Sequence, residues 1–301
     1  MNKTTGLATL LVCVLTACGG GGGGSPSSAG APGAGTPTDA PQPMPSTPTA
    51  GSLQPVPTAP TATATIYNEC TDAVGMTMPT GYSRREVYAM VSGGKTTGEV
   101  TTEEVINGPG VFEGQNAIQT TATSTTKILA TDTSSGYTTV NREVLYYKIQ
   151  NNGLVTHFGA DIETVTSGFT TGGLPIPGNT TKTKEIYSSD DSSRYLTLKL
   201  GESIETTSVG TRTTLLSTGT SIPVPFNYKS SFTYVAREAV NVLGRTFDTC
   251  KYTEKSGDES SATSLWLLVG KGTMVKTETS LGTAGTMQML LQSGTYNGVA
   301  L

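Results

Sequence analysis

Residues 141–159 read NREVLYYKIQNNGLVTHFG, and this stretch decides the fold that we predict. Its first nine residues are rich in Val, Leu, Tyr and Ile, which favour strands. Asn151, Asn152 and Gly153 then give a strong turn signal, because Asn and Gly tolerate the positive φ angles of tight hairpins. The run LVTHFG has the composition of a second strand. The stretch therefore predicts an antiparallel hairpin.

The same pattern of strand-forming runs and turn residues recurs from residue 65 to the C-terminus. Short runs rich in β-branched and aromatic residues alternate with turn residues such as Gly and Pro. Strands are expected at 84–91, 141–149, 154–159, 183–187, 195–200, 203–209, 231–242, 246–253, 264–269, 273–281 and 287–291. The mature chain shows no convincing helical period. Strands at hairpin spacing, without helices for crossover connections, predict an all-β antiparallel meander.

The C-terminal strands carry a more specific pattern. TFDTCK at 246–251 is followed by LWL at 265–267 and by GTMVK at 272–276. This order resembles uncharacterised bacterial envelope proteins, in which a Gly-Thr-Phe-x-x-Cys strand precedes a Trp/Tyr strand and a Gly-x-Val-Lys hairpin. The chain departs from that pattern at Arg245, where Gly is usual, and it lacks the preceding Pro-Ala. The resemblance implies a strongly curved sheet or half-barrel of the lipoprotein-carrier kind.

The N-terminus has the anatomy of a secretory signal. Residues 1–18 read MNKTTGLATLLVCVLTAC, with Lys3 as the positive region and a short apolar run from Gly6 to Val14. That run is too short to span a bilayer as a helix. We therefore expect residues 1–17 to be a cleaved signal peptide.

The end of this segment, Leu15-Thr16-Ala17-Cys18, resembles the bacterial lipobox. The resemblance implies a diacylglycerol thioether on Cys18, cleavage just before it and acylation of the new amine. Two or more acyl chains give stable membrane anchoring. Gly19 stands where an Asp would favour the inner membrane, so the expected location is the bacterial outer membrane, facing the periplasm or the cell surface. The alternative is an ordinary signal peptide with an incidental cysteine.

The segment 18–64 is expected to be a disordered tether behind the lipidated cysteine. It contains a Gly run at 19–24 and then mainly Pro, Thr, Ala and Ser, with almost nothing apolar to bury. A flexible chain of this length has an r.m.s. span of about 40 Å. The segment could instead offer a Pro-rich ligand to a groove-binding partner. A β-rich domain is expected over 65–301.

Two of the 4 cysteines remain after the signal peptide and the lipid site are assigned. Cys70 and Cys250 form an even pair in an oxidising compartment, which favours a disulfide between them. Two separate buried thiols are the alternative. A redox pair is not expected, because no Cys-x-x-Cys motif is present.

Few residues suggest chemistry. His157 is the single histidine, and Asp161 and Glu163 follow it at a spacing that places all three on one face of a regular strand. This cluster could act in acid–base catalysis or bind a metal ion, but the favoured interpretation is that the three residues form a polar face of the sheet. Asp190 and Asp191 lie in the run SSDDSS, which is expected to be a solvated loop because it lacks the alternating ligands of a calcium site.

The aromatic residues Tyr146, Tyr147 and Trp266 are expected to form core or cross-strand pairs rather than a ligand cage. The net charge of -4 gives no basic surface for nucleic acid. No catalytic motif, metal site or cofactor site is recognised, so an enzyme is not expected.

Two classes of function remain. The first is a membrane-anchored, non-enzymatic binding module for an apolar ligand, a lipid or a partner protein of the envelope. The second is a structural or surface-displayed lipoprotein involved in adhesion or envelope integrity. A concave sheet lined by apolar side chains would favour the first, and a filled core would favour the second.

Overall fold

The computed structural model describes residues 67–301 apart from 131–134, 151, 171–173, 216–218, 257–261 and 283–284. The predicted signal peptide 1–17, the lipidation site Cys18 and the 18–64 tether lie outside the described residues. Asn151 of the predicted turn also lies outside them.

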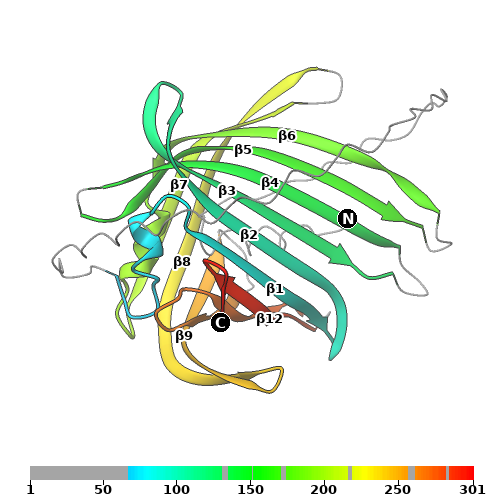
Figure 1. Cartoon of the computed structure of the whole chain (residues 1–301), viewed down its shortest axis with the longest axis vertical. Helices are drawn as coiled ribbons and strands as arrows, with labels where there is room; N and C mark the ends of the chain where they lie inside the picture. The colour runs from blue at the N-terminus through cyan, green and yellow to red at the C-terminus, as the bar shows by residue number, and fades with distance from the viewer. Residues whose placement is uncertain are drawn as a thin grey trace, which may run out of the picture. The chain divides into compact units, whose positions relative to one another are not determined.

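The described chain is built almost entirely of strands. In chain order they are β1 (Ser83–Ser92), β2 (Lys95–Phe112), β3 (Gln115–Ile128), β4 (Gly136–Ile149), β5 (Val155–Phe169), β6 (Pro175–Asp190), β7 (Ser203–Leu215), β8 (Ser221–Val242), β9 (Arg245–Ser256), β10 (Ala262–Leu268), β11 (Met274–Ser280), β12 (Thr286–Tyr296) and β13 (Val299–Ala300). Each strand pairs with its neighbour in sequence. The all-β antiparallel meander is therefore confirmed (Figure 1).

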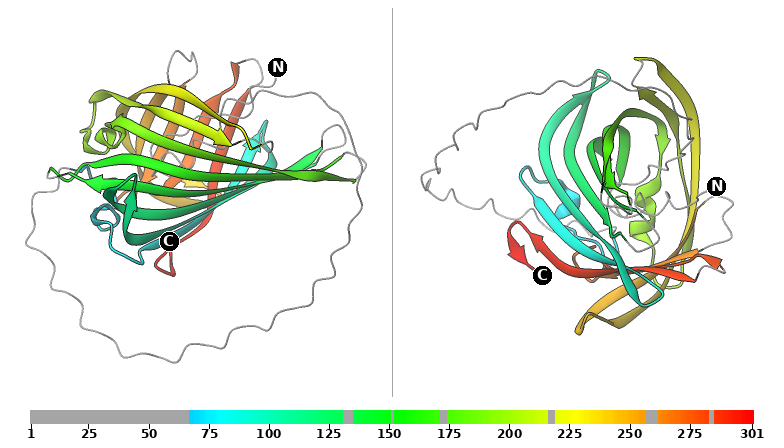
Figure 2. Two further views of the ribbon diagram at one scale, coloured as in Figure 1. Left: turned by 90° about the horizontal axis from the view of Figure 1, so that it is seen from above. Right: turned by 90° about the vertical axis from the view of Figure 1, so that its right-hand side faces the viewer.

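The meander closes into a 12-stranded barrel. β1 pairs with β12 in an antiparallel ladder that runs from Arg84 opposite Tyr296 to Ser92 opposite Met287. The first and last long strands consequently lie side by side, cyan against red (Figure 2). The expected curvature of the sheet thus continues to full closure, which removes the unpaired edges that an open sheet would expose.

The hairpin predicted from residues 141–159 is confirmed as β4 and β5. The two strands pair from Ile149 opposite Val155 to Gly136 opposite Phe169. At the turn, Gly153 adopts a φ of 85° and its N–H donates to the carbonyl of Gln150 at 2.8 Å. Asn and Gly at this point therefore set the register of the hairpin, as the sequence indicates.

Bulges bend the strands toward closure. Register shifts occur in most neighbouring pairs, including one residue left over at Phe158 between β4 and β5 and one at Val235 between β8 and β9. A bulge bends and twists the strand that carries it. Gly159 follows the bulge in β5, and a Cβ there would lie 2.3 Å from the carbonyl oxygen of Glu185. Because glycine has no Cβ, strands β5 and β6 can lie close to each other at this point, where the sheet bends.

One predicted strand is wrong. Residues 195–200 were expected to extend, but η3, a 3-10 helix, covers Ser192–Thr197. Its apolar residues turn into the end of the barrel instead of pairing with a neighbouring strand. The ring of Tyr195 stacks on Phe232 with centroids 4.6 Å apart, and Leu198 is buried. Among the described residues, no helix is long and apolar enough to cross a membrane.

The interior has two apolar clusters. The larger lies mainly on β1 and β8–β12 and includes Tyr234, Tyr252 and Leu265. The smaller contains Leu145, Tyr147, Val155 and Ala160 of β4 and β5. Residues 67–82, which precede β1, connect the clusters, because Cys70 belongs to the first while Met76 and Met78 pack against the second. We call residues 67–82 the N-terminal plug.

Candidate functional site

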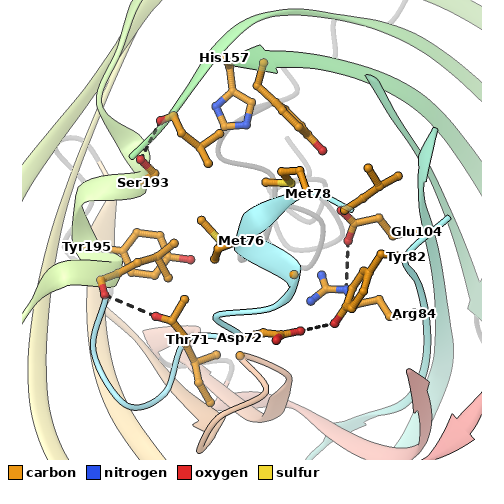
Figure 3. Close-up of a pocket in the computed structure, with 17 residues that line it drawn as sticks. Thr71, Asp72, Met76, Met78, Tyr82, Arg84, Glu104, His157, Ser193 and Tyr195 are labelled. Carbon is orange, nitrogen blue, oxygen red and sulfur yellow. Dashed lines mark hydrogen bonds and ion pairs between the residues drawn. The ribbon is translucent and has the colours of Figure 1, made fainter. Parts of the chain in front are cut away.

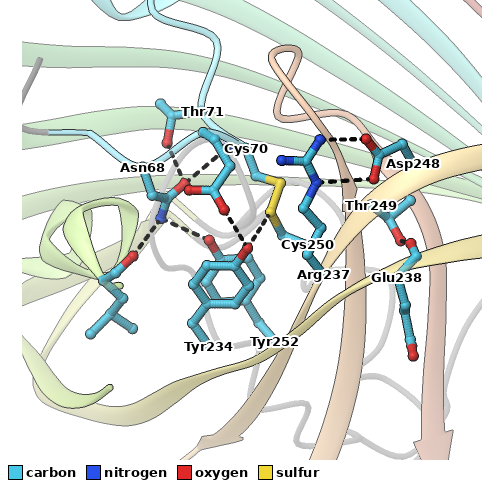
Figure 4. Close-up of a disulfide and its surroundings, with 12 residues drawn as sticks. Asn68, Cys70, Thr71, Tyr234, Arg237, Glu238, Asp248, Thr249, Cys250 and Tyr252 are labelled. Atoms are coloured by element: carbon cyan, nitrogen blue, oxygen red, sulfur yellow. Dashed lines mark hydrogen bonds and ion pairs between the residues drawn. A yellow bond between two sulfur atoms is a disulfide. The ribbon is translucent and has the colours of Figure 1, made fainter. Parts of the chain in front are cut away.

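The N-terminal plug is fastened inside the barrel by a disulfide. Cys70 bonds to Cys250 of β9, with the two Cα atoms 6.0 Å apart and both residues fully buried (Figure 4). The structure therefore pairs the two cysteines as the sequence predicts. The bond closes a loop of 180 residues and ties the first described residues to the late strands.

Hydrogen bonds surround this disulfide. The Tyr234 hydroxyl donates to the Glu69 carboxylate at 2.7 Å, and the Asn68 side-chain amide donates to the Tyr252 hydroxyl at 2.7 Å. The rings of Tyr234 and Tyr252 stack 4.8 Å apart. Because a buried tyrosine hydroxyl needs a partner, these bonds make the plug part of the core of this half of the barrel.

A small cavity of about 60 Å³ lies between the plug and the barrel wall (Figure 3). The plug, the strands and η3 all contribute to its lining, and the side chains that matter below are Asp72, Met76, Met78, Tyr82, Arg84, Glu104, Tyr147, His157 and Tyr195. The lining thus combines thioethers and aromatic rings with a few charged groups.

His157 is held in place by Asp190. The imidazole Nδ1 lies 2.7 Å from the Asp190 carboxylate, and the His157 backbone N–H also donates to that carboxylate at 3.2 Å. The Ser208 hydroxyl donates to Asp190 at 2.6 Å. Burial alone would raise the pKa of Asp190, but His157 and these hydrogen bonds outweigh it and hold the pKa at about 2. The pair fixes the ring at the cavity wall.

The expected cluster of His157, Asp161 and Glu163 does not form. The bulge at Phe158 reverses the alternation of side chains, so His157 faces inward while Asp161 and Glu163 face outward. Asp161 accepts a hydrogen bond from Tyr146, and Glu163 pairs with Arg142 and Lys182 on the outer surface. The favoured interpretation of these two carboxylates as a polar sheet face is confirmed, but His157 does not belong to it.

The prediction for Asp190 is also wrong. Asp190 is the last residue of β6 and is buried, not part of a solvated loop. Only Asp191 lies at the surface, where it pairs with Arg194 at 3.0 Å. Register explains the difference, because Asp190 lies opposite Ser208 of β7 and its side chain points into the barrel. The partner of Asp190, His157, lies 33 residues earlier in the chain, so no local pattern marks Asp190 as buried.

The predictions for the aromatic residues are confirmed. Tyr147 faces the lumen and bonds to Thr120, whereas Tyr146 faces outward and stacks on Phe112 with centroids 4.6 Å apart. Trp266 lies on the outer face between two lysines, with Lys251 and Lys276 at 4.9 and 4.6 Å from its ring. These are cross-strand packing contacts.

Besides His157 and Asp190, further charged residues line the inner face of the barrel, and the sequence does not single them out. Arg84 pairs with Glu104 at 3.0 Å beside the cavity, and burial raises the pKa of Glu104 against the opposing effect of Arg84. Farther along the lumen, Glu185 is fully buried and accepts a hydrogen bond from Arg212 at 2.6 Å. In the sequence these charged residues alternate with Thr and Val, as residues on the solvent-facing side of a strand do. No local pattern therefore marks them as internal.

Glu143 differs from these pairs. It is 6% exposed, and the charged groups that act on its carboxylate are Glu185, Glu104 and Arg212. Burial raises its pKa to about 8, with Glu185 and Glu104 adding to the effect and Arg212 opposing it. A carboxyl in this state keeps its proton at neutral pH and costs less to bury than an ion.

The comparisons with known proteins give a fold likeness alone. No protein-family model and no curated protein matches the chain. Among solved structures, it is similar to a β-barrel-like protein of a domain of unknown function, DUF1849, from Brucella abortus. The identity is 9%, the match covers 72% of this chain and 99% of that one, and the TM-score is 0.40.

Asp190→Asn is expected to remove a pH-dependent part of the stability. In the wild type the folded pKa of about 2 lies below the ordinary value of 3.8, so the contribution is present above pH 4 and is lost as the pH falls toward 2. Its size is on the order of 2 kcal/mol. Urea unfolding of both proteins from pH 2 to 7 measures it. A gap between the two proteins that stays constant below pH 4 would contradict the assignment.

Proposed function

We propose that this chain is a lipid-anchored structural protein of the bacterial envelope, and that its barrel is a non-enzymatic scaffold. The observation that carries the proposal is the plug inside the barrel. The disulfide fastens this plug between the two apolar clusters, and the cavity between the plug and the barrel wall measures about 60 Å³.

That volume argues against transport of a lipid inside the barrel. Sites for drug-sized or lipid-like ligands enclose roughly 300–1,000 Å³. An acyl chain would have to displace the plug, which the disulfide and the bonds of Asn68 and Glu69 oppose. A structural role is therefore favoured over carriage of an apolar ligand.

The outer face supports a role in a watery compartment. It carries exposed ion pairs such as Arg85 with Glu103 and Arg237 with Asp248. Charged groups of this kind are costly in a hydrocarbon environment. The face is suited to contact with water and with the polar surfaces of other envelope components.

The proposed location in the cell rests on the N-terminal residues. The lipobox-like end of the signal segment, with Cys18, supports lipid anchoring in the outer membrane. The Gly- and Pro-rich stretch that follows supports a spacer of about 40 Å between lipid and barrel. Together they would tether a rigid body to the membrane surface while letting its distance from that surface vary.

Cys18→Ala tests the anchor. The substituted chain is expected to be absent from the outer-membrane fraction and to lose the mass of its acyl chains, because the thioether depends on the thiol. Fractionation and intact-mass measurement of the exported chain give the result. Cys13→Ala is the matched control, since that cysteine lies in the signal peptide and its loss should leave anchoring unchanged. Unchanged fractionation of Cys18→Ala would refute the proposed anchor.

Native mass spectrometry of the full chain after mild extraction tests the scaffold proposal. A filled barrel should release no stoichiometric lipid from its interior, and the only acyl chains found should be those covalently attached at Cys18. A co-purifying lipid that survives delipidation at one per chain would reverse the choice and support the apolar-ligand function. Increased sensitivity of a deletion strain to detergent, restored by the wild-type chain, is the expected cellular result.

A further inference from the structure

We propose that the cavity beside the N-terminal plug is a binding site for one Cu(I) ion, held by the imidazole of His157 and the thioethers of Met76 and Met78. The proposal goes beyond the scaffold function and does not depend on it. It rests on the juxtaposition of these three side chains at one small cavity (Figure 3).

The imidazole of His157 has the hydrogen-bonding arrangement of a metal-binding histidine. His157 is 4% exposed, and its Nδ1 is committed to the buried carboxylate of Asp190. Its Nε2 has no partner within the described ranges, although the ring lines the cavity. Ligand histidines in proteins typically donate their second ring N–H to a carboxylate, which fixes the tautomer and makes the free nitrogen more basic.

The two thioethers come from a short turn of the plug. Met76 lies in η2, a 3-10 helix that covers Gly75–Thr77, and Met78 follows as its C-cap. In an α-helix, residues two apart are rotated by about 200° around the axis, so their side chains point to nearly opposite sides. Met78 instead adopts a left-handed conformation with φ 52° and ψ 50°, and both side chains point into the space below His157 (Figure 3). A non-glycine residue in this conformation is uncommon, and here it turns the Met78 side chain to the same side as Met76.

The donor set selects the metal. Thioether sulfur is soft and favours Cu(I) over zinc, calcium or magnesium, while imidazole suits copper as well. The described residues hold no group of three or more His, Cys, Asp and Glu side chains that could bind a harder ion. One nitrogen and two sulfurs give a neutral ligand set for a monovalent d¹⁰ ion.

The charges around the cavity also favour a cation. Asp72 and Glu104 line it, and Asp190 lies directly behind His157. Arg84 is the one guanidinium among the lining residues, and it is paired with Glu104. Carboxylates therefore outnumber the cationic group at the site, so one added positive charge improves the balance. Met76 and Met78 are half-buried.

The test measures Cu(I) affinity in the full chain carrying Cys13→Ser and Cys18→Ser, so that the remaining cysteines are the disulfide pair. Competition with the chromophoric chelator bicinchoninate reports Cu(I), and native mass spectrometry with Ag(I) gives the stoichiometry. We expect one ion per chain. Met76→Leu and Met78→Leu should each weaken binding at least about tenfold, and the double variant should weaken it more.

Leucine keeps the volume of methionine, so the folded structure should survive these changes. Met289→Leu in the larger cluster is the control and should bind as the parent does. X-ray absorption of the Cu(I) form should show one nitrogen and two sulfur neighbours. If the parent binds no ion, or if the double Met76/Met78 variant binds as tightly as the parent, the side chains only pack against the smaller cluster and the proposal is wrong.

Discussion

The double substitution Cys70→Ser/Cys250→Ser should lower the free energy of unfolding by up to about 5 kcal/mol. The disulfide closes a loop of 180 residues, so it removes a large conformational entropy from the unfolded chain. It also holds the plug against Tyr234 and Tyr252. Without it, the plug depends on hydrogen bonds and on its apolar contacts alone.

Urea unfolding, followed by the fluorescence of Trp266 and the tyrosines, measures this loss. Cys70→Ala/Cys250→Ala is the matched control, because it removes the same bond without burying two hydroxyls. Wild type unfolded in the presence of a reductant should match the alanine variant. A double variant within about 1 kcal/mol of the oxidised wild type would show that the bond does not constrain the unfolded chain as proposed.

Local features of this fold could be predicted from the sequence, because they depend on neighbouring residues. Asn152 and Gly153 specify a tight turn, and the aromatic and β-branched residues on each side specify the strands that meet there. The pairing of Cys70 with Cys250 could be narrowed to one disulfide because the remaining cysteines had other expected roles. Neither the hairpin nor the disulfide required knowledge of how the rest of the chain folds.

Closure and side-chain direction could not be predicted in this way. The pairing of β1 with β12 joins residues about 200 positions apart, such as Arg84 and Tyr296, and no local pattern encodes it. The bulge at Phe158 is equally hidden, yet it turns His157 inward and separates it from Asp161. One unpaired residue therefore decides which face of the sheet carries the imidazole.

The candidate copper ligands were missed for the same reason. Met76 and Met78 read as apolar residues ahead of the first strand, and Asp190 reads as part of a polar loop. Only the closed barrel brings the plug and β5 to one cavity, with Asp190 of β6 bonded to His157 behind it. The spacing of the two methionines, together with the single histidine, is the signal that was available in the sequence.

Glu143→Gln should stabilise the barrel, and more strongly as the pH rises. The folded-state pKa of Glu143 is about 8, raised by burial and then by Glu185 and Glu104, against an ordinary value of 4.5. The unfolded chain therefore loses this proton at lower pH than the folded chain does. Between pH 4.5 and 8 the folded state binds more protons, so wild-type stability falls as the pH rises.

The expected size of the stability difference follows from the pH range between the unfolded and folded pKa values of Glu143. Each pH unit inside it costs up to about 1.4 kcal/mol, so the wild type loses about 4 kcal/mol by pH 8 relative to a chain without the group. Glutamine has nearly the same shape and no proton to lose, so the variant should lack this slope. The free energy of unfolding in urea from pH 5 to 9 measures both proteins.

Glu163→Gln is the matched control, because Glu163 lies on the outer face of the neighbouring strand and pairs there with Arg142 and Lys182. Its substitution should leave the pH slope of the wild type in place. If Glu143→Gln keeps that slope as well, Glu143 is ionised in the folded barrel at neutral pH, and water or an ion must reach its carboxylate. If the slope disappears, the lumen at Glu143 is closed enough to keep a carboxyl protonated, as expected for a barrel whose interior is filled rather than open to a ligand.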